Sequence, residues 1–81
     1  YGYGVNQDYK EAIKYYKLAA DQGHPKAQNN LGFMYQNGQG VNRDYKEAIK
    51  YYKLAADQRH PLGQNNLGFM YQNGQGVNRD Y

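Results

Sequence analysis

Apolar and small side chains recur every three or four residues between positions 9 and 22, with polar side chains between them. The recurring residues are Tyr9, Ala12, Ile13, Tyr16, Ala19 and Ala20. This spacing matches an α-helix with one buried face. Asp8 stands just before the segment and Glu11 follows three residues later, which resembles a capping box. We therefore expect a helix over about residues 9–22.

The next segment carries its own start and stop signals for a helix. Pro25 follows His24, and proline suits the first helical position while it pushes its predecessor out of the helical region. One face of the following turns carries Ala27, Leu31, Met34 and Tyr35. Gly38 then supplies a left-handed stop. These signals predict a second helix over about residues 25–37.

The whole pattern repeats after 36 residues. When residues 1–45 are aligned with residues 37–81, 39 of 45 positions are identical. The pairs that differ are Tyr1/Asn37, Tyr3/Gln39, Gln7/Arg43, Gly23/Arg59, Lys26/Leu62 and Ala27/Gly63. We therefore expect two more helices, over about residues 45–58 and 61–73. The predicted fold is all-α, an α-solenoid of stacked antiparallel helix pairs in a single repeat domain, residues 1–81.

Two positions in the repeat bear on its stability. Gly32 and its copy Gly68 lie inside predicted helices, where glycine costs about 1 kcal/mol relative to alanine. We expect a neighbouring helix to approach closely there. Arg59 replaces the helix-ending Gly23, which costs about 1 kcal/mol if the backbone keeps its left-handed geometry.

Composition narrows the classes of protein only partly. The 81 residues include 11 tyrosines, no cysteine and a formal net charge of +3. Tyrosine and alanine must do most of the packing, and disulfides and thiolate metal sites are excluded. No apolar run approaches the roughly 20 residues of a membrane span, so we expect a soluble chain with no membrane contact. Nothing in the sequence indicates a compartment.

The repeat also carries a recognisable signature. Its residues are Leu31-Gly32, Tyr35, Gly38, Gly40-Val41, Asp44, Ala48, Tyr51-Tyr52 and Ala55-Ala56. This pattern resembles that of Sel-one-like repeats, which are relatives of tetratricopeptide repeats, and the resemblance covers the whole chain. It implies a right-handed superhelix with about two repeats here. Because neither end reads as a capping repeat, we expect a fragment of a longer array, or self-stacking.

The leading functional hypothesis is a scaffold or adaptor that binds a protein or peptide partner. Stacked helix pairs present an extended concave surface, and the resemblance to tetratricopeptide-like adaptors implies the same function. On the helix face opposite Ala27 and Leu31, each unit places two amides and a phenylalanine. The predicted partner-binding residues are Asn29, Phe33, Gln36, Asn65, Phe69 and Gln72. The alternative role of the phenylalanines is packing against an adjacent repeat.

Two other binding functions are compatible with the repeat. Near-identical units with open ends favour a head-to-tail contact that extends into a filament. Such a contact joins Tyr9, Ala12 and Tyr16 of one chain to Leu67, Met70 and Tyr71 of the next. RNA binding would use the lysines at positions 10, 14, 17, 46, 50 and 53, but acidic residues interrupt them. A solvated helix face explains that charge better, so nucleic acid is the weakest of these partners.

Catalysis has little support. His24 and His60 are the only histidines, and each precedes a proline at the same repeat position. Helix N-capping explains them without a catalytic partner. A metal site needs three or four converging ligands, which the sequence does not indicate. We predict no catalytic residue, no metal and no cofactor, and hence a protein that is not an enzyme.

Overall fold

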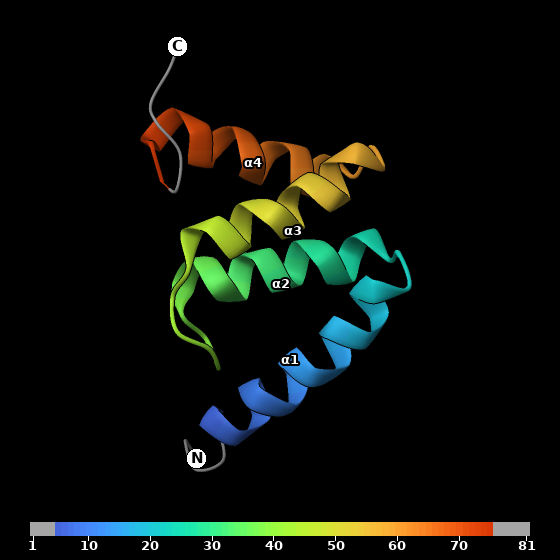
Figure 1. The fold of residues 1–81 in the computed structure, drawn as a ribbon, viewed down its shortest axis with the longest axis vertical. Coiled ribbons are helices and arrows are strands. Elements are labelled where there is room, and N and C mark those ends of the chain that lie inside the picture. The colour runs from blue at the N-terminus through green and yellow to red at the C-terminus, as the bar shows by residue number, and fades with distance from the viewer. Residues whose placement is uncertain (1–4, 76–81) are drawn as a thin grey trace.

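The computed structural model describes residues 5–75. These residues form four helices and no strand: α1 (Val5–Asp21), α2 (Pro25–Asn37), α3 (Tyr45–Asp57) and α4 (Pro61–Asn73). Figure 1 shows them stacked in chain order from α1 to α4. Each helix contacts the next, and α2 also contacts α4. This one-directional stacking confirms the predicted all-α solenoid.

The helix boundaries lie within one residue of the predicted ones, except at the start of α1. That helix begins at Val5, four residues earlier than predicted. Before α3, the backbone N–H of Asp44 donates to the carbonyl of Tyr35 at 2.9 Å, which holds the loop out of the helix. Within residues 5–75 no helix precedes Val5. Asp8 therefore lies inside α1 and does not precede it, in contrast to the capping position expected from the sequence.

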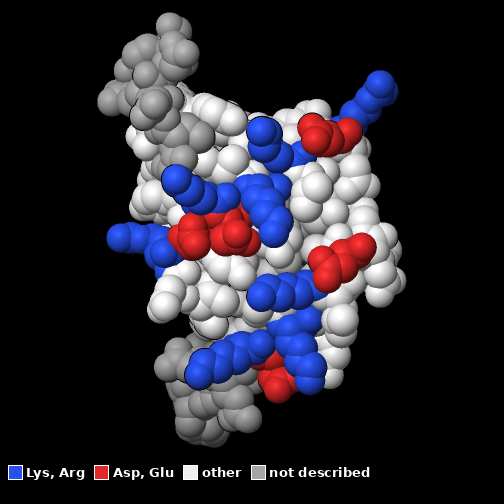
Figure 2. Space-filling view, in the orientation of Figure 1, with Lys and Arg blue, Asp and Glu red and all other residues white. Residues whose placement is uncertain are grey.

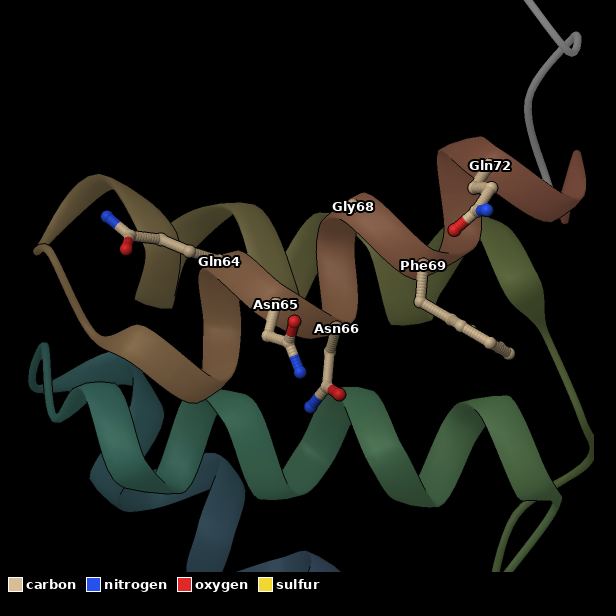
Figure 3. Close-up of a pocket in the computed structure, with 6 residues that line it drawn as sticks. All are labelled: Gln64, Asn65, Asn66, Gly68, Phe69 and Gln72. Carbon is tan, nitrogen blue, oxygen red and sulfur yellow. The ribbon is translucent and has the colours of Figure 1, made fainter.

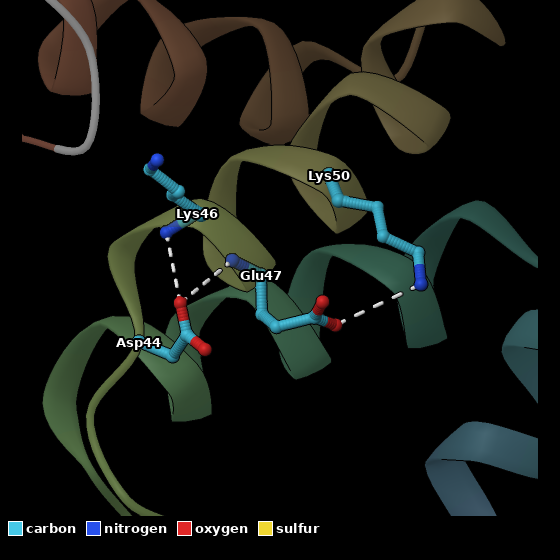
Figure 4. A network of polar contacts seen from close by, with 4 residues as sticks. All are labelled: Asp44, Lys46, Glu47 and Lys50. Atoms are coloured by element: carbon cyan, nitrogen blue, oxygen red, sulfur yellow. Dashed lines mark hydrogen bonds and ion pairs between the residues drawn. The ribbon is translucent and has the colours of Figure 1, made fainter.

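The start of α3 is fixed by Asp44. Its Oδ1 atom accepts hydrogen bonds from the backbone N–H groups of Lys46 at 3.1 Å and Glu47 at 3.2 Å. Figure 4 shows this cap and the neighbouring ion pair, in which Glu47 Oε1 lies 3.7 Å from Lys50 Nζ. The cap predicted at Asp44 is confirmed, although Glu47 pairs with Lys50 and does not reach back to Asp44.

Two clusters of buried side chains form the core. The cluster around α1 and α2 contains Ile13, Ala20, Ala27, Leu31, Met34 and Tyr51. The cluster between α3 and α4 contains Ala48, Ile49, Tyr52 and Met70. Tyr35 packs against both clusters, and its ring stacks on Tyr51 with the centroids 5.8 Å apart. Tyrosine and alanine therefore contribute much of the packing, as the composition predicts.

Gly32 lets α3 pack directly against α2. A Cβ atom at this position would lie 2.5 Å from Cδ1 and 2.6 Å from Cε1 of Tyr52, whereas carbon atoms in contact lie about 3.5–4.0 Å apart. The Tyr52 side chain is fully buried, so it has no room to move aside. The close approach expected at Gly32 is confirmed. At Gly68, a Cβ atom would meet no atom of the described residues within 4 Å.

The turn between α3 and α4 holds a non-glycine residue in the left-handed conformation. Gly23, between α1 and α2, has φ of 90°, and Arg59 at the same repeat position has φ of 63°. An L-residue in this region costs roughly 1–2 kcal/mol. The backbone keeps its left-handed geometry at Arg59, so this turn carries strain that the first turn does not.

The two helical glycines give a matched pair of stability predictions. Gly32→Ala should lower the free energy of unfolding by about 1–2 kcal/mol, because overpacking against Tyr52 exceeds the gain in helix propensity. Gly68→Ala should raise it by about 0.5–1 kcal/mol, because the added methyl group meets nothing. Urea unfolding followed by circular dichroism in dilute solution measures both values. A Gly32→Ala variant at least as stable as the parent chain would refute the close contact.

The two left-handed turns give a second pair of stability predictions, in which the substitutions are the reverse of each other. Arg59→Gly relieves about 1 kcal/mol of backbone strain, but about half of this is offset because glycine makes the unfolded chain more flexible. We expect a net gain of about 0.5 kcal/mol in the free energy of unfolding. Gly23→Arg should lose a similar amount. The same urea titration tests both, and changes of equal sign in the two variants would contradict the assignment of strain to Arg59.

Candidate interaction surface

Phe33 and Phe69 project from the stack into solvent. Phe33 on α2 is 49% exposed and Phe69 at the same position of α4 is 53% exposed. Asn65 and Gln72 on α4 are also exposed. Four of the six predicted partner-binding residues therefore lie on open surface. They include both phenylalanines, the residues that a binding surface would use as apolar anchors.

The other two predicted residues already have partners within the chain. Asn29 is only 7% exposed, and its Oδ1 atom accepts a hydrogen bond from Asn66 Nδ2 at 3.0 Å. Gln36 Oε1 accepts from the Tyr52 hydroxyl at 2.6 Å, and Gln36 Nε2 donates to Gln75 Oε1 at 3.2 Å. The second unit covers this side of α2. Asn29 and Gln36 thus join the two units, in contrast to the open positions expected for them.

Tyr52 is the centre of this junction between units. Burial raises the pKa of its hydroxyl well above the usual value for tyrosine. The group therefore stays protonated and remains a hydrogen-bond donor to Gln36 over the ordinary range of pH. Since both groups are neutral, this hydrogen bond is not weakened by the screening that salt exerts on ion pairs.

The sequence reasoning missed a third amide contact in the junction. Gln28 is 3% exposed, and its Oε1 atom accepts a hydrogen bond from Gln58 Nε2 at 2.8 Å. Gln28 Nε2 in turn donates to the carbonyl of Ala20 at 3.1 Å. A usable signal was present, because Gln28, Asn29 and Asn30 all return unchanged after 36 residues. The paired amides occupy different positions of the repeat, because Gln58 is the copy of Gln22 and Asn66 is the copy of Asn30.

Each phenylalanine lines a shallow groove. The groove beside Phe33 has a volume of about 210 Å³ and is also lined by Tyr9, Ala12, Tyr16, Asn30, Met34 and Gln39. The groove beside Phe69, about 410 Å³, is also lined by Gln64, Asn65, Asn66, Gly68 and Gln72. Figure 3 shows these side chains along one side of α4, with Asn66 directed toward α2. The lining of both grooves is uncharged.

Charge is concentrated on α1 and α3 rather than on the helices that carry the phenylalanines. Figure 2 shows lysine and arginine side chains across one face of the molecule, with acidic side chains between them. In contrast, α2 contains one charged residue, Lys26, and α4 contains none. The surface around Phe33 and Phe69 is therefore apolar and amide in character, and it offers little attraction to phosphate groups.

The side chains of the two histidines do not have the capping role expected from the sequence. His24 and His60 occupy the N-cap positions of α2 and α4, but neither side chain makes a capping hydrogen bond. No group of three or more potential metal ligands occurs among residues 5–75. Nor does any helix in this range combine the length and apolar character needed to cross a membrane.

The head-to-tail contact expected from the sequence needs one correction. Tyr71 is 40% exposed and open to a partner. Met70 is fully buried, because it packs against Ala48, Ile49 and Tyr52 inside its own chain. Met70 therefore cannot contribute to a contact with a second copy unless α4 separates from α3.

Comparison with known proteins places this architecture in a family. The family model of the Sel1 repeat matches residues 1–24, 25–60 and 61–81. The crystal structure of a Sel1 repeat protein from Oxalobacter formigenes aligns with a TM-score of 0.85 and 38% identity, over 89% of this chain and 30% of that one. A protective antigen of uropathogenic Escherichia coli strains that displays an SLR fold aligns with a TM-score of 0.90 and 50% identity, over 99% of this chain and 17% of that one.

One relative found by sequence aligns with a shorter part of this chain than the two structures do. An uncharacterized protein of Neisseria meningitidis serogroup B is 51% identical over 39 residues, which are 48% of this chain and 8% of that protein. The chain thus spans less than a third of the length of each of these three relatives. The family model, however, matches along its full length. The chain belongs to the Sel1 repeat family.

Proposed function

We propose that this chain is a protein-interaction module that binds an extended, largely uncharged segment of a partner protein along α2 and α4. Sel1 repeats generally mediate protein interactions. The observation that carries the proposal is the pair of half-exposed phenylalanines, Phe33 and Phe69, at the same position of two successive units. Exposed aromatic side chains flanked by amides are typical of interface anchors.

The exposure of Phe33 argues against a purely structural role for this repeat position. The second unit already stacks against α2, and it covers Asn29, yet Phe33 remains 49% exposed. Packing of an adjacent unit therefore does not use the phenylalanine. Phe69 has the same relation to its own helix, with Asn65 and Gln72 exposed beside it. We assign the two phenylalanines as anchors and the two α4 amides as the polar part of the surface.

The charge distribution favours a protein partner over a nucleic acid. Binding to a phosphate backbone depends on lysine and arginine side chains, and α2 and α4 together contain only Lys26. The lysines of α1 and α3 lie among acidic residues, as with Lys50 beside Glu47. A neutral peptide segment can instead place apolar side chains against the phenylalanines and bond its backbone to the amides.

A peptide selection tests this proposal. Random peptides of about twelve residues, which span up to about 40 Å when extended, are displayed on phage and selected on the immobilised chain. The affinity of selected synthetic peptides is then measured by isothermal titration calorimetry. We expect Phe33→Ser combined with Phe69→Ser to weaken binding at least about tenfold, because buried aromatic anchors carry much of the energy of an interface.

The chain offers a matched control for this double substitution. Leu18 on α1 and Leu54 on α3 are also one repeat apart and are 54% and 42% exposed. Leu18→Ser combined with Leu54→Ser removes a similar apolar area from the other helices and should leave peptide affinity unchanged. Equal losses in both double variants, or no loss in the phenylalanine variant, would contradict the proposed surface.

A further inference from the structure

We propose that the open face of α4 binds α1 of a second copy of this chain, head to tail, and repeats the contact that α2 makes with α3. The interaction goes beyond the proposed binding of a peptide, since it does not require Phe33 or Phe69. The template for this interaction is the contact between α2 and the second unit within the same chain. The contact between α2 and α3 is the most extensive of the helix contacts in the described chain.

The template consists of a few well-defined pairs. The ring of Tyr52 covers Gly32, and its hydroxyl donates to Gln36. Tyr51 stacks on Tyr35 with an interplanar angle of 8°. Two amide pairs complete it, Gln58 with Gln28 and Asn66 with Asn29. Of these α2 residues, Gly32, Gln28 and Asn29 are buried, and Tyr35 and Gln36 are half-buried.

Every α2 member of the template has an identical copy on α4. The copies are Gln64, Asn65, Gly68, Tyr71 and Gln72, and all five are exposed. All but Tyr71 line the groove of about 410 Å³, which Figure 3 shows along α4. A Cβ atom at Gly68 would meet nothing within 4 Å in the described chain. The space that the Tyr52 ring fills over Gly32 is therefore also present over Gly68, where no atom of the described residues occupies it.

The residues of the second unit that take part in the template have copies in the first unit, on and after α1. They are Tyr15, Tyr16, Gln22 and Asn30, which correspond to Tyr51, Tyr52, Gln58 and Asn66. The difference in environment is largest for the stacked tyrosine: Tyr51 is 7% exposed, whereas Tyr15 is 61% exposed. In the assembly, Tyr16 of the second copy covers Gly68 and donates to Gln72, while Tyr15 stacks on Tyr71.

The charge of the two faces is compatible with this contact. Because α4 carries no charged residue, the lysines of α1 meet no like charge. Phe69 should stay about half exposed, as Phe33 does in the template. The two faces differ from each other, so the contact is heterologous, leaves a free face at each end and adds further copies. Stacking covers Asn65 and Gln72, which also belong to the proposed peptide surface, but it leaves the phenylalanines free. Substitution of the phenylalanines therefore separates peptide binding from stacking.

The first measurement is solution mass by light scattering from about 10 μM to about 1 mM, the range in which weak interfaces assemble. The 81-residue chain, of 9.4 kDa, should grow in mass with concentration and reach no fixed oligomer. Gly68→Gln should abolish the increase in mass, because its side chain fills the space over position 68 that Tyr16 of the second copy would occupy. Tyr15→Glu should also abolish the increase, because it places a carboxylate at the position where Tyr51 is buried in the template. A mass of one chain at every concentration would overturn the proposal.

Two substitutions serve as controls. Leu62→Gln also places a glutamine on the surface of α4, and Leu18→Glu adds the same charge to α1. Their template positions, Lys26 and Leu54, stay exposed when units stack, so both variants should assemble as the parent does. Loss of growth in either control, or growth in either blocking variant, would reject the assigned contact. Circular dichroism of each variant verifies that its helix content is unchanged.

A mixing experiment tests the head-to-tail geometry itself. The Gly68→Gln variant keeps an intact α1 face, and the Tyr15→Glu variant keeps an intact α4 face. Mixed in equal amounts, they should form a complex of two chains, at twice 9.4 kDa, and grow no further. A mixture that stays at the mass of one chain would overturn the proposal. Since both variants keep the phenylalanines, failure here leaves the peptide selection unaffected.

Discussion

The contact between the Tyr52 ring and Gly32 is the constraint on which the described fold depends. It sets how closely α3 lies to α2, because the ring occupies the space that any side chain at position 32 would take. The same ring belongs to the cluster with Ala48, Ile49 and Met70, so it also positions α4. Its hydroxyl must find an acceptor once buried, and Gln36 supplies it at 2.6 Å. One tyrosine thereby joins packing and hydrogen bonding across the units.

Identical residues have different surroundings in the two units, and this difference points to function. Tyr16 and Tyr52 are the same residue of the repeat, yet Tyr52 is fully buried and Tyr16 lines an open groove. Gly32 is covered and Gly68 is not. In a solenoid each unit buries only what its neighbours cover. The phenylalanines are the exception, since Phe33 and Phe69 are equally exposed in both environments.

Local signals in the sequence predicted most of the fold. Proline at the start of α2 and α4, the Asp44 cap and the 36-residue period fixed helix positions to within a residue, because each acts over a few neighbouring residues. The start of α1 could not be found in this way. Asp8 and Asp44 have similar sequence neighbours, yet the backbone of Asp44 bonds to Tyr35 outside the helix, whereas Asp8 lies within α1. The sequence does not show whether such a partner is present.

The prediction of surface residues from the sequence had the same limit at the candidate site. Helical periodicity placed Asn29, Phe33 and Gln36 on one polar face of α2, but a face of this width is divided when another unit stacks obliquely on one of its edges. The stacked unit covers Asn29 and leaves Phe33 exposed. The division separates two tasks along one helix. Amides join the two described units to one another, whereas the phenylalanine beside them is exposed in both units, which is why we propose it as the anchor for a partner.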